Sequence, residues 1–433
     1  MTVRDRIYRF IIDHRICKYI ASAVCNRFNL FNDDYTNIKA NLSNLDENLK
    51  TVCFVADCYW NTVECTLPVL TYLKEHENCN IIFLAKEKVT YQKAKENIFF
   101  KNQIDKVSDV VLYNTSILIQ RDSNFGKLKA YIKNIVFYSI LEFWLDRIRL
   151  DAILSLYSAD VFVEELISRH PEAKVVGESH AAFDGSMYYD GDPVECIDAD
   201  IFFFPDSSLQ FFSEKVIKKS VITGAPIYDE WWRKILVDIS GVQELSQHLM
   251  SFEKKRLLIV MPYLPDVRRC FADEYEELGN FLKEVQDSYT IVFKFHPREM
   301  ANDIDEFFKK NELQSGDYII SVIPLISLAT IMDCVVVVGA STSTSDVLIS
   351  DIPVIEFHNN SYHIGFFAFG DNQYGTLFRK HDIVPYAATA MDLVKTVEDI
   401  LFNALWERYE KKYKEYIPAN NNACKRVSEL LLK

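Results

Sequence analysis

The fold is decided by two stretches, Thr290-Ile-Val-Phe-Lys-Phe-His-Pro-Arg-Glu299 and Cys334-Val-Val-Val-Val-Gly-Ala-Ser-Thr-Ser-Thr-Ser-Asp346. Each begins as a short apolar run, which is typical of a buried parallel strand, and ends in polar residues. In an open α/β sheet, ligands bind beyond the carboxyl ends of the strands. We therefore expect two strand ends of one domain to form a site for an anion, and a nucleotide phosphate fits it best.

The first stretch carries three cationic residues in five positions. Residues that leave a strand alternate between its two faces, so one face is expected to hold Lys294, His296 and Arg298. Phe295 is expected to be buried on the opposite face, and Pro297 ends the strand because it has no N–H. These cations could neutralise a phosphate leaving group. The alternative is a salt-bridged strand end that faces solvent.

The second stretch turns at Gly339 and continues with five hydroxyl residues, Ser341–Ser345. Glycine permits a tight turn, and hydroxyls together with unpaired N–H groups at a helix start favour a phosphate. The alternative is ordinary N-capping, although a cap needs only one such residue. Asp346 falls near the first turn of the predicted helix, where it could cap the helix or bind a ribose hydroxyl.

Composition places the chain among globular proteins of two ordinary domains. It has 433 residues, of which 49% are hydrophobic and 25% charged, and a net charge of −14. This acidic balance argues against a general nucleic-acid binder. The ten cysteines form no CxxC pair, which indicates buried thiols in a reducing cytosol. We find no signal peptide and no segment of membrane-spanning length, so a cytoplasmic location is expected.

Residues 1–30 form a basic amphipathic pattern within this acidic chain. Their basic residues are Arg4, Arg6, Arg9, Arg15, Lys18 and Arg27, against Asp5 and Asp13. A basic amphipathic helix can lie on an anionic membrane surface, at the inner face of the membrane. Alternatively, the helix packs on its own domain and its arginines are solvated.

Two series of strands and helices organise the rest of the chain. The first predicts strands at 51–56, 80–84, within 107–118, and at 152–156, 174–176, 201–204 and 221–223. After a break at Gly224-Ala-Pro226, a helix is expected to run to about Phe252, and the second series predicts strands at 257–261, 291–295, 318–322, 335–338 and 354–357. Two doubly wound, Rossmann-like α/β domains facing each other across a cleft make the architecture called GT-B.

The predicted domain limits follow from these series. Residues 1–45 form the basic helical segment, 46–235 the N-terminal acceptor domain, 236–390 the C-terminal nucleotide-donor domain, and 391–433 two C-terminal helices. Two polar residues are candidates for a base: His180, at a strand end, and Glu64, on the helix after the first strand, with Asp57 and Glu178 in reserve. His180 titrates near neutral pH, which suits a general base. The alternative for each is a solvated or capping role.

Several chemistries lose support because their motifs are absent. The chain has no G-x-S-x-G, no G-x-G-x-x-G, no G-x-x-x-x-G-K-[ST] and no H-E-x-x-H, the motifs of hydrolases, dinucleotide enzymes, P-loop proteins and zinc proteases. Asp198-Ala-Asp200 precedes a predicted strand and does not follow one. No metal site is therefore expected, and the chemistry is predicted to be metal-independent.

The motifs resemble those of a known enzyme group. The order of Val221-Ile-Thr-Gly-Ala-Pro-Ile-Tyr-Asp229, Lys294-Phe-His-Pro-Arg-Glu299, Gly339-Ala-Ser-Thr-Ser-Thr-Ser-Asp346 and Asp351-Ile-Pro-Val-Ile355 is similar to bacterial GT-B enzymes of surface polysaccharide synthesis. That group includes capsule glycosyltransferases, CDP-glycerol glycerophosphotransferases, and sialyl- and Kdo-transferases with HP and S/T-S motifs. The resemblance covers residues 150–357. It implies that His296 and Ser341–Ser345 hold the nucleotide phosphate and that the acceptor base comes from the first domain.

The chain also departs from its relatives. Ser179-His180-Ala181 stands where related enzymes often have Gln-His-Gly. Asp33-Asp34 is followed by Tyr35, whereas the sialyltransferases have a glycine after their acidic pair, which argues against sialic acid as the donor. The UDP-N-acetylglucosamine 2-epimerases share the fold, but their Glu and His constellation is not recognisable here.

The resemblance implies a metal-independent glycosyltransferase that moves a sugar from a CMP-, CDP- or UDP-linked donor to a bacterial surface glycan of capsule or lipopolysaccharide type. The acceptor would be a glycan or a lipid-linked glycan, and the nucleotide-activated sugar is a co-substrate, so no separate cofactor is expected. In a direct displacement, the expected catalytic residues are His180, Glu64 and His296. The donor is expected to contact Lys294, Arg298, Glu299, Ser341, Thr342, Ser343, Thr344 and Asp346.

Two other interpretations of the function stay open. The first is another enzyme of the same fold, either a CDP-polyol polyolphosphotransferase or a UDP-sugar 2-epimerase. The second is a non-catalytic GT-B subunit that binds a glycan or a partner protein.

Overall fold

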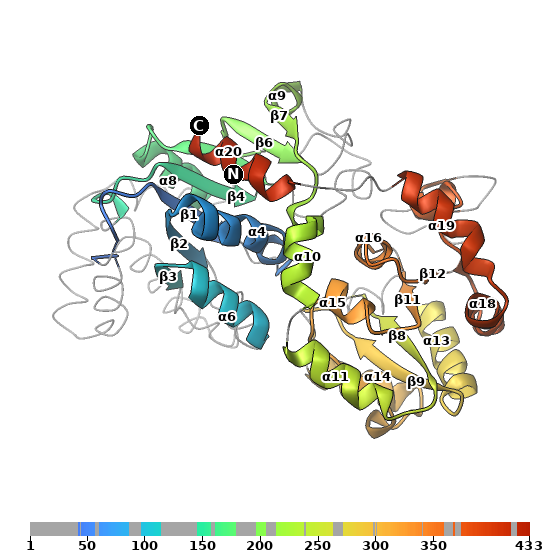
Figure 1. Ribbon diagram of the computed structural model, residues 1–433. Coiled ribbons are helices and arrows are strands. Elements are labelled where there is room, and N and C mark those ends of the chain that lie inside the picture. Colours follow the sequence, from blue (N-terminus) through green and yellow to red (C-terminus); the bar gives the residue numbers. More distant parts are fainter. Residues whose placement is uncertain are drawn as a thin grey trace, which may run out of the picture.

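The structure is a computed structural model, and it describes residues 42–43, 45–56, 60–85, 97–113, 145–156, 161–178, 196–204, 214–237, 240–262, 272–297, 299, 301–339, 341–358, 367–368, 374–416 and 422–433. Within them the chain forms two α/β units, each built on a parallel sheet (Figure 1). The two predicted series of strands are thus confirmed.

The N-terminal sheet has seven strands in the order β3-β2-β1-β4-β5-β6-β7, and every neighbouring pair is parallel. The strands are β1 Thr51–Ala56, β2 Asn80–Ala85, β3 Val110–Tyr113, β4 Ala152–Leu156, β5 Lys174–Glu178, β6 Ile201–Phe204 and β7 Ser220–Ile222. The order reverses between β1 and β4. Such a switch point is where ligands bind in doubly wound sheets, at the carboxyl ends of the strands.

Helices cover both faces of this sheet. One face packs against α4 Trp60–Tyr72, which continues as a π-helical turn over Leu73–Glu77, and against α6 Ile98–Val107. The other face packs against α8 Val161–Arg169 and α9 Glu214–Lys218. The strands bear apolar residues on both faces because both are buried, which is why their sequences are nearly continuous apolar runs.

The C-terminal sheet has six parallel strands in the order β10-β9-β8-β11-β12-β15. They are β8 Lys255–Val260, β9 Tyr289–Lys294, β10 Ile319–Ile320, β11 Cys334–Val338, β12 Val354–Phe357 and β15 Tyr386–Ala387. Five strands were predicted, and β15 is the addition. It has only two residues, which are too few to form the apolar run from which a buried strand is predicted. A separate antiparallel pair joins β13 Phe367–Ala368 to β14 Tyr374–Gly375.

The helices of the C-terminal unit are α11 Ser240–Met250, α13 Ala272–Val285, α14 Ala301–Lys310, α15 Leu325–Ala329, α16 Ser343–Leu348, α17 Leu377–Lys380 and α18 Ala390–Phe402. An aromatic cluster ties α14 to β9. Phe295 stacks on Phe293 at 5.4 Å, and both rings contact Phe307 and Phe308 edge-on. Phe295 is therefore buried on the face opposite Lys294, as predicted.

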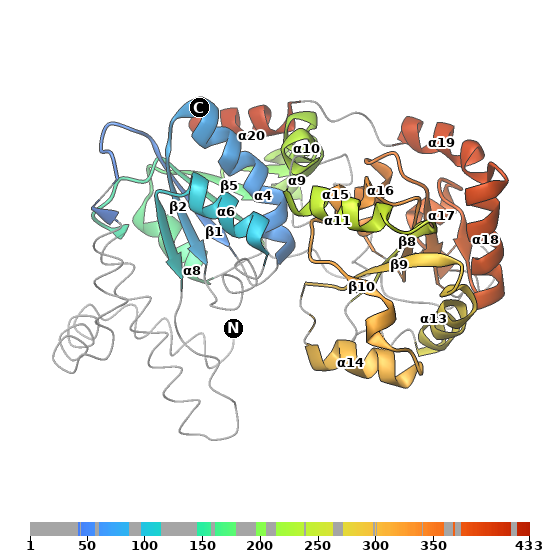
Figure 2. The ribbon, with the colours of Figure 1, turned by 60° about the horizontal axis from the view of Figure 1, so that its bottom comes forward.

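One segment connects the two units. After β7 the chain turns at Gly224, with a φ of 82°, and forms a short 3-10 helix, η3 Pro226–Tyr228, followed by α10 Glu230–Val237. Where a single helix was predicted, the structure has α10 and α11 as separate helices. The ring of Trp231 on α10 packs against the ring of Tyr72 of the N-terminal unit, with 5.6 Å between the ring centroids. Arg233 Nη1, also on α10, donates to the carbonyl of Ile349 in the C-terminal unit at 2.9 Å. In Figures 1 and 2, α10 lies between the two units.

Three helices end the chain where two were predicted: α18, α19 Leu405–Tyr416 and α20 Ala423–Leu432. Helix α18 packs on α13 and β15 of the C-terminal unit, whereas α20 returns to the N-terminal unit and contacts α4, β4 and β5 (Figure 1). Two hydrogen bonds join α20 to the connecting segment. The N–H of Cys424 donates to Asp229 Oδ2 at 3.0 Å, and Arg426 Nε donates to the carbonyl of Thr223 at 2.7 Å.

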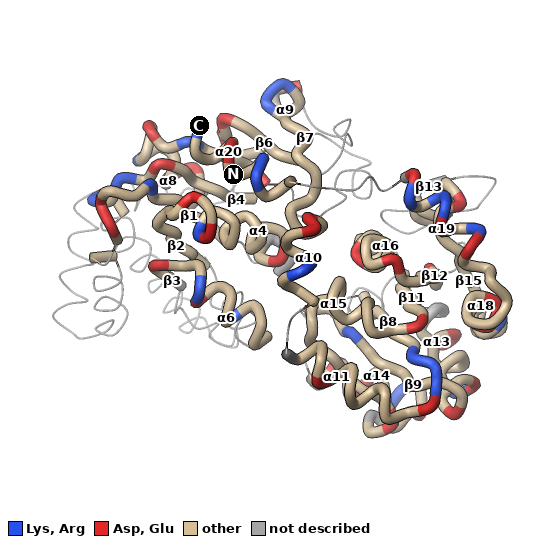
Figure 3. The backbone as a smooth tube through the Cα atoms, viewed as in Figure 1, with Lys and Arg blue, Asp and Glu red and all other residues tan. Residues whose placement is uncertain are grey.

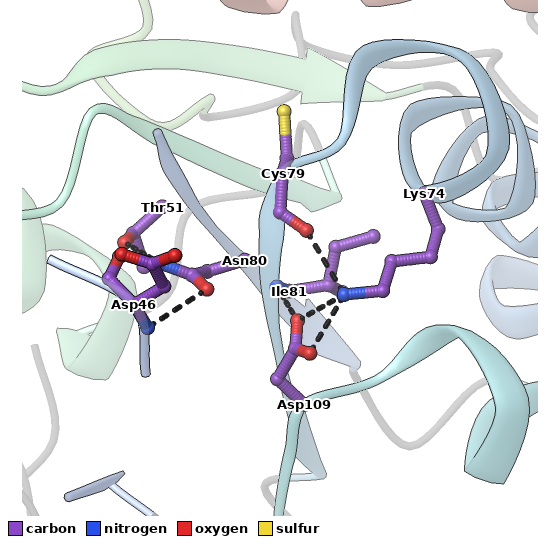
Figure 4. A network of polar contacts seen from close by, with 7 residues as sticks. All are labelled: Asp46, Thr51, Lys74, Cys79, Asn80, Ile81 and Asp109. Carbon is purple, nitrogen blue, oxygen red and sulfur yellow. Dashed lines mark hydrogen bonds and ion pairs between the residues drawn. The ribbon is translucent and has the colours of Figure 1, made fainter. Parts of the chain in front are cut away.

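Aspartates fix the amino ends of the strands. In Figure 4, the carboxylate of Asp109, which precedes β3, accepts the N–H of Ile81 at the start of β2 and also pairs with Lys74. The same bond, at 2.8 Å each time, joins Asp151 to the N–H of Thr51, Asp200 to Val175 and Asp333 to Arg256. Asp200 of the Asp-Ala-Asp sequence therefore lies at the amino edge of the sheet, opposite the carboxyl edge where a ligand is predicted to bind.

Charge lies mainly on the outer helices. Figure 3 shows both signs interspersed along α18 and α19, whereas the strands are mostly uncharged. No helix in the described part of the chain is long and apolar enough to cross a membrane.

Candidate functional site

The two predicted strand ends lie in the same sheet with one strand between them. Lys294, the last residue of β9, is in register with Val260 of β8, which in turn pairs with Val337 of β11. Adjacent strands are about 4.8 Å apart, so the two ends lie about 10 Å apart along the same edge. The order of this sheet reverses between β8 and β11. The two motifs thus flank the switch point of the C-terminal sheet.

The loop after β11 turns at Gly339 as predicted. Its φ is 73°, a conformation that costs other residues energy, and its N–H donates to the carbonyl of Phe357 at 2.8 Å. Beyond the turn, Ser341, Thr342 and Ser343 are partly exposed, and the N–H of Ser343 donates to Ser341 Oγ at 3.1 Å. This loop presents hydroxyl groups at the carboxyl edge.

The next hydroxyl points into the interior. Thr344 is fully buried, and its Oγ1 donates to Glu356 Oε1 on β12 at 2.9 Å, while Thr376 donates to the other carboxylate oxygen. Burial raises the pKa of Glu356 to about 7, although both hydroxyl bonds act to lower it. Glu356 was not predicted. A lone glutamate in the apolar strand Val-Ile-Glu-Phe was the signal that could have revealed it.

Charged residues from both units influence one another's ionisation beside this edge. Glu64 on α4 interacts electrostatically with Lys294 and with Asp346 on α16, and Lys294 and Asp346 interact with each other. Tyr228 of the connecting segment donates its hydroxyl to Asp346 Oδ1 at 2.8 Å and is only 1% exposed. We call Glu64, Lys294, Asp346 and Tyr228 the interdomain cluster.

Burial governs the ionisation of the cluster. It lowers the pKa of Lys294, which the charges of Glu64 and Asp346 act to raise. Burial also raises the pKa of Asp346 to about 7, the hydrogen bond from Tyr228 acts to lower it, Glu64 raises it further, and Lys294 lowers it. Of the predicted site residues, Glu64, Lys294 and Asp346 therefore influence one another's ionisation, although they come from two different domains.

Tyr228 was missed as a site residue because its motif, Gly-Ala-Pro-Ile-Tyr-Asp, was interpreted as a hinge. It does lie in the connecting segment. The signal was a tyrosine directly after the break, whose hydroxyl needs a polar partner once the ring is buried.

Glu178 ends β5 at the carboxyl edge of the N-terminal sheet. It is fully buried, its Oε2 accepts from Thr66 Oγ1 on α4, and its Oε1 has no hydrogen-bond partner among the described residues. Burial raises the pKa of Glu178 to about 8, opposed by the bond from Thr66. This carboxyl is therefore largely protonated at neutral pH.

The other predicted site residues lie as follows. His296, two residues beyond β9, is partly exposed, and its carbonyl accepts the N–H of Glu299 at 2.9 Å. Glu299 is buried, with 7% of its surface exposed. His180, Arg298 and Asp57 are outside the described residues.

No family model and no curated protein matches this sequence. Solved structures do match in fold. The UDP-GlcNAc 2-epimerase from Methanocaldococcus jannaschii, in complex with UDP-GlcNAc and UDP, has a TM-score of 0.57 at 13% identity, over 88% of this chain and 99% of that chain. The epimerase from Neisseria meningitidis bound to UDP-GlcNAc has a TM-score of 0.55 at 13% identity, with the same coverage of 88% and 99%.

The wall teichoic acid polymerase TagF matches over a larger part of this chain. Its TM-score is 0.55 at 13% identity, over 96% of this chain and 97% of that chain. Identities this low show the fold alone. With its two parallel α/β units and its match to these structures over nearly their whole length, the protein has the GT-B fold, with two Rossmann-like domains, as the sequence predicted.

Proposed function

We propose that the protein is a glycosyltransferase that moves a sugar from a nucleotide donor to a bacterial surface glycan of capsule or lipopolysaccharide type. One observation carries the proposal. A carboxylate of the N-terminal domain, Glu64, and a lysine at a strand end of the C-terminal domain, Lys294, interact where the two domains meet. A candidate base and a candidate phosphate ligand therefore act on each other electrostatically, which supports a transfer between an acceptor and a donor at this position.

The donor half of the mechanism falls to the C-terminal domain. Negative charge develops on the nucleotide phosphate as the bond to the sugar breaks, and groups already in place stabilise it without reorganising. Lys294 and His296 supply positive charge or hydrogen-bond donors in this proposal, and the partly exposed hydroxyls of Ser341, Thr342 and Ser343 supply further donors. Arg298 would add a cation from the same motif.

The acceptor half falls to the N-terminal domain. A base takes the proton of the acceptor hydroxyl as its oxygen attacks the sugar carbon, and the nucleotide departs with the bonding electrons. Glu64 and His180 are the two candidates. The electrostatic interaction between Glu64 and Lys294 favours Glu64 as the base, because Lys294 belongs to the proposed phosphate-binding side of the site.

The fold also supports a second candidate, transfer of a polyol phosphate from a CDP-polyol. Its support is the match to the teichoic acid polymerase, which spans 96% of this chain. A UDP-sugar 2-epimerase is the third enzyme of this fold. Products separate the three, because sugar transfer from a UDP-sugar releases UDP, polyol-phosphate transfer from a CDP-polyol releases CMP, and epimerisation changes the sugar without an acceptor.

The test begins with binding of CMP, CDP, UDP and GDP by calorimetry and continues with turnover of the matching donor. His296→Ala should reduce turnover by a hundredfold or more, since loss of one transition-state donor costs about 3–4 kcal/mol, while nucleotide affinity changes modestly. Glu64→Gln and His180→Ala are compared to find the base. If no nucleotide binds the wild-type protein at millimolar concentration, the donor site is rejected and the non-catalytic subunit takes its place.

A further inference from the structure

The interdomain cluster has an unusual charge for a phosphate site, and this inference rests on the proposed function. Lys294 brings one positive charge, whereas Glu64 and Asp346 bring two negative charges when both are ionised. With every group charged, the cluster carries a net charge of −1, which opposes the binding of an anion beside Lys294. Protonation or displacement of one carboxylate removes this opposition.

Asp346 is held where it cannot move away easily. Tyr228, itself buried in the connecting segment, donates to Asp346 Oδ1 at 2.8 Å. The carbonyl of Asp346 accepts Ser350 Oγ at 3.2 Å, and Ser350 Oγ also contacts the carbonyl of Ile326 at 3.1 Å. Thr344 bonds to Glu356 near the start of α16, and Arg233 donates to the carbonyl of Ile349 just after its end, so α16 is fixed near both ends. The remaining response to an arriving anion is protonation.

We propose that a nucleotide phosphate binds at the interdomain cluster together with a proton, which Asp346 takes up, and that the hydroxyl of Tyr228 sets the pH range of this uptake. The groups that bear on Asp346 are Glu64 on α4, Lys294 on β9 and Tyr228 on η3. Uptake leaves Asp346 neutral and the cluster without net charge. The Lys294 ammonium is then available to the phosphate.

The ionisation of Asp346 supports this inference. Its pKa is raised to about 7, so the carboxyl is close to half ionised at neutral pH before any ligand arrives. A bound dianion raises the pKa further because like charges disfavour ionisation. Tyr228 acts in the opposite direction, since a hydrogen bond donated to a carboxylate stabilises its charged form.

The test is calorimetry of UDP and of CDP binding to the full chain, at a fixed pH in two buffers of different ionisation enthalpy. The difference in binding heat gives the protons taken up. The nucleotide phosphate itself titrates near pH 6. The informative quantity is therefore the proton uptake of the wild type minus the proton uptake of Asp346→Asn. This difference should be about half a proton at pH 7 and approach one by pH 8, because a group with a pKa of about 7 is mostly ionised there.

Variants separate the roles. Asp346→Asn keeps an oxygen for Tyr228 and should bind nucleotide at least as tightly at pH 8 as at pH 7, whereas wild-type affinity should fall by up to about tenfold over that interval. Tyr228→Phe should take up less proton at pH 7 and retain uptake to higher pH. Glu172→Gln is the control, since Glu172 is an exposed carboxylate of the N-terminal domain outside the cluster, and this variant should behave as wild type.

Equal proton uptake by wild type and Asp346→Asn would overturn the inference. A loss of proton uptake in His296→Gln but not in Asp346→Asn would also overturn it, because the proton would then go to His296. Weaker binding by Asp346→Asn across the whole pH range would also overturn it, because ionised Asp346 would then be a ligand contact, as for a ribose hydroxyl. In each case nucleotide still binds and the proposed function stands. If no nucleotide binds at all, the proposed function itself fails.

Discussion

At the scale of single residues, the protein holds carboxyl groups that desolvation keeps protonated at unusually high pH. The pKa of Glu178 is raised to about 8, and those of Asp346 and Glu356 to about 7. A group with a raised pKa in the folded state binds protons more tightly there than in the unfolded chain. Stability is therefore greatest at low pH for these groups and falls as the pH rises from the ordinary carboxyl range towards the raised pKa.

Glu178→Gln should make the protein more resistant to alkaline pH. Glutamine has the shape of the protonated acid and never ionises, so the variant escapes a cost of about 1.4 kcal/mol for each unit of pKa shift. The wild type should lose stability between pH 5 and pH 8, where Glu178 must ionise in a fully buried position. Thermal melting at pH 5 and pH 9 measures this, and the variant should gain several degrees over wild type at pH 9 only.

The control is Glu172→Gln, at an exposed position of the same domain, which should leave both melting temperatures unchanged. A Glu178→Gln variant that melts like wild type at pH 9 would show that this carboxyl finds a compensating partner when it ionises.

At the scale of elements, β5 depends on a glycine for its contact with β6. A Cβ atom built on Gly177 would lie 2.4 Å from the ring of Phe202, which is 1% exposed and cannot move without disturbing the core. This close approach brings the end of β5, with Glu178, against its neighbour. The requirement is steric, because Gly177 is paired in an ordinary parallel ladder.

Gly177→Ala should therefore destabilise the protein by about 1–3 kcal/mol, the usual cost of overpacking a core. Gly316→Ala is the matched control, since a Cβ there meets nothing within 4 Å, and it should change stability by less than about 0.5 kcal/mol. Urea unfolding of both variants measures the difference. Equal stability of the two would mean that Phe202 has room to rotate away.

At the scale of the whole molecule, helix α20 makes the C-terminus part of the N-terminal domain. Val427 is fully buried in the same apolar cluster as residues of α4 and β1, whereas Lys425 on the same helix is exposed. Val427→Asp should cost several kcal/mol, because it buries a charge without a partner, and Lys425→Asp should cost little. Calorimetric melting compares them, and an unaltered melt for Val427→Asp would show that α20 is dispensable.

Attachment of the whole chain to a membrane is proposed to occur through residues 1–30, which lie outside the described residues. Anionic lipid should attract this basic segment by about 1 kcal/mol for each basic residue near the surface. Removal of residues 1–30 should therefore lower binding to vesicles that contain phosphatidylserine and leave nucleotide affinity unchanged. Sedimentation with vesicles tests it, and equal binding by both forms would reject the attachment.

The sequence by itself determined the two sheets, the Gly339 turn, the burial of Phe295 and the edge of the sheet at which Lys294 and the hydroxyl loop end. These properties are local. Alternation and continuous apolar runs encode a buried strand, and a positive φ at a turn requires glycine, whatever the rest of the chain does. Short elements such as β15, with two residues, are too brief to leave such a pattern.

Only the tertiary structure decided which side chains meet. Tyr228 and Asp346, which are 118 residues apart in sequence, share a hydrogen bond. Glu64 of one domain acts electrostatically on Lys294 of the other, and Thr344 bonds inward to Glu356 although it stands in a run of similar hydroxyl residues. Nothing local marks such partners, because the packing of α4, α16 and the connecting segment sets both the contacts and the burial. That burial then shifts the pKa of Asp346 from that of an ordinary surface aspartate to about 7.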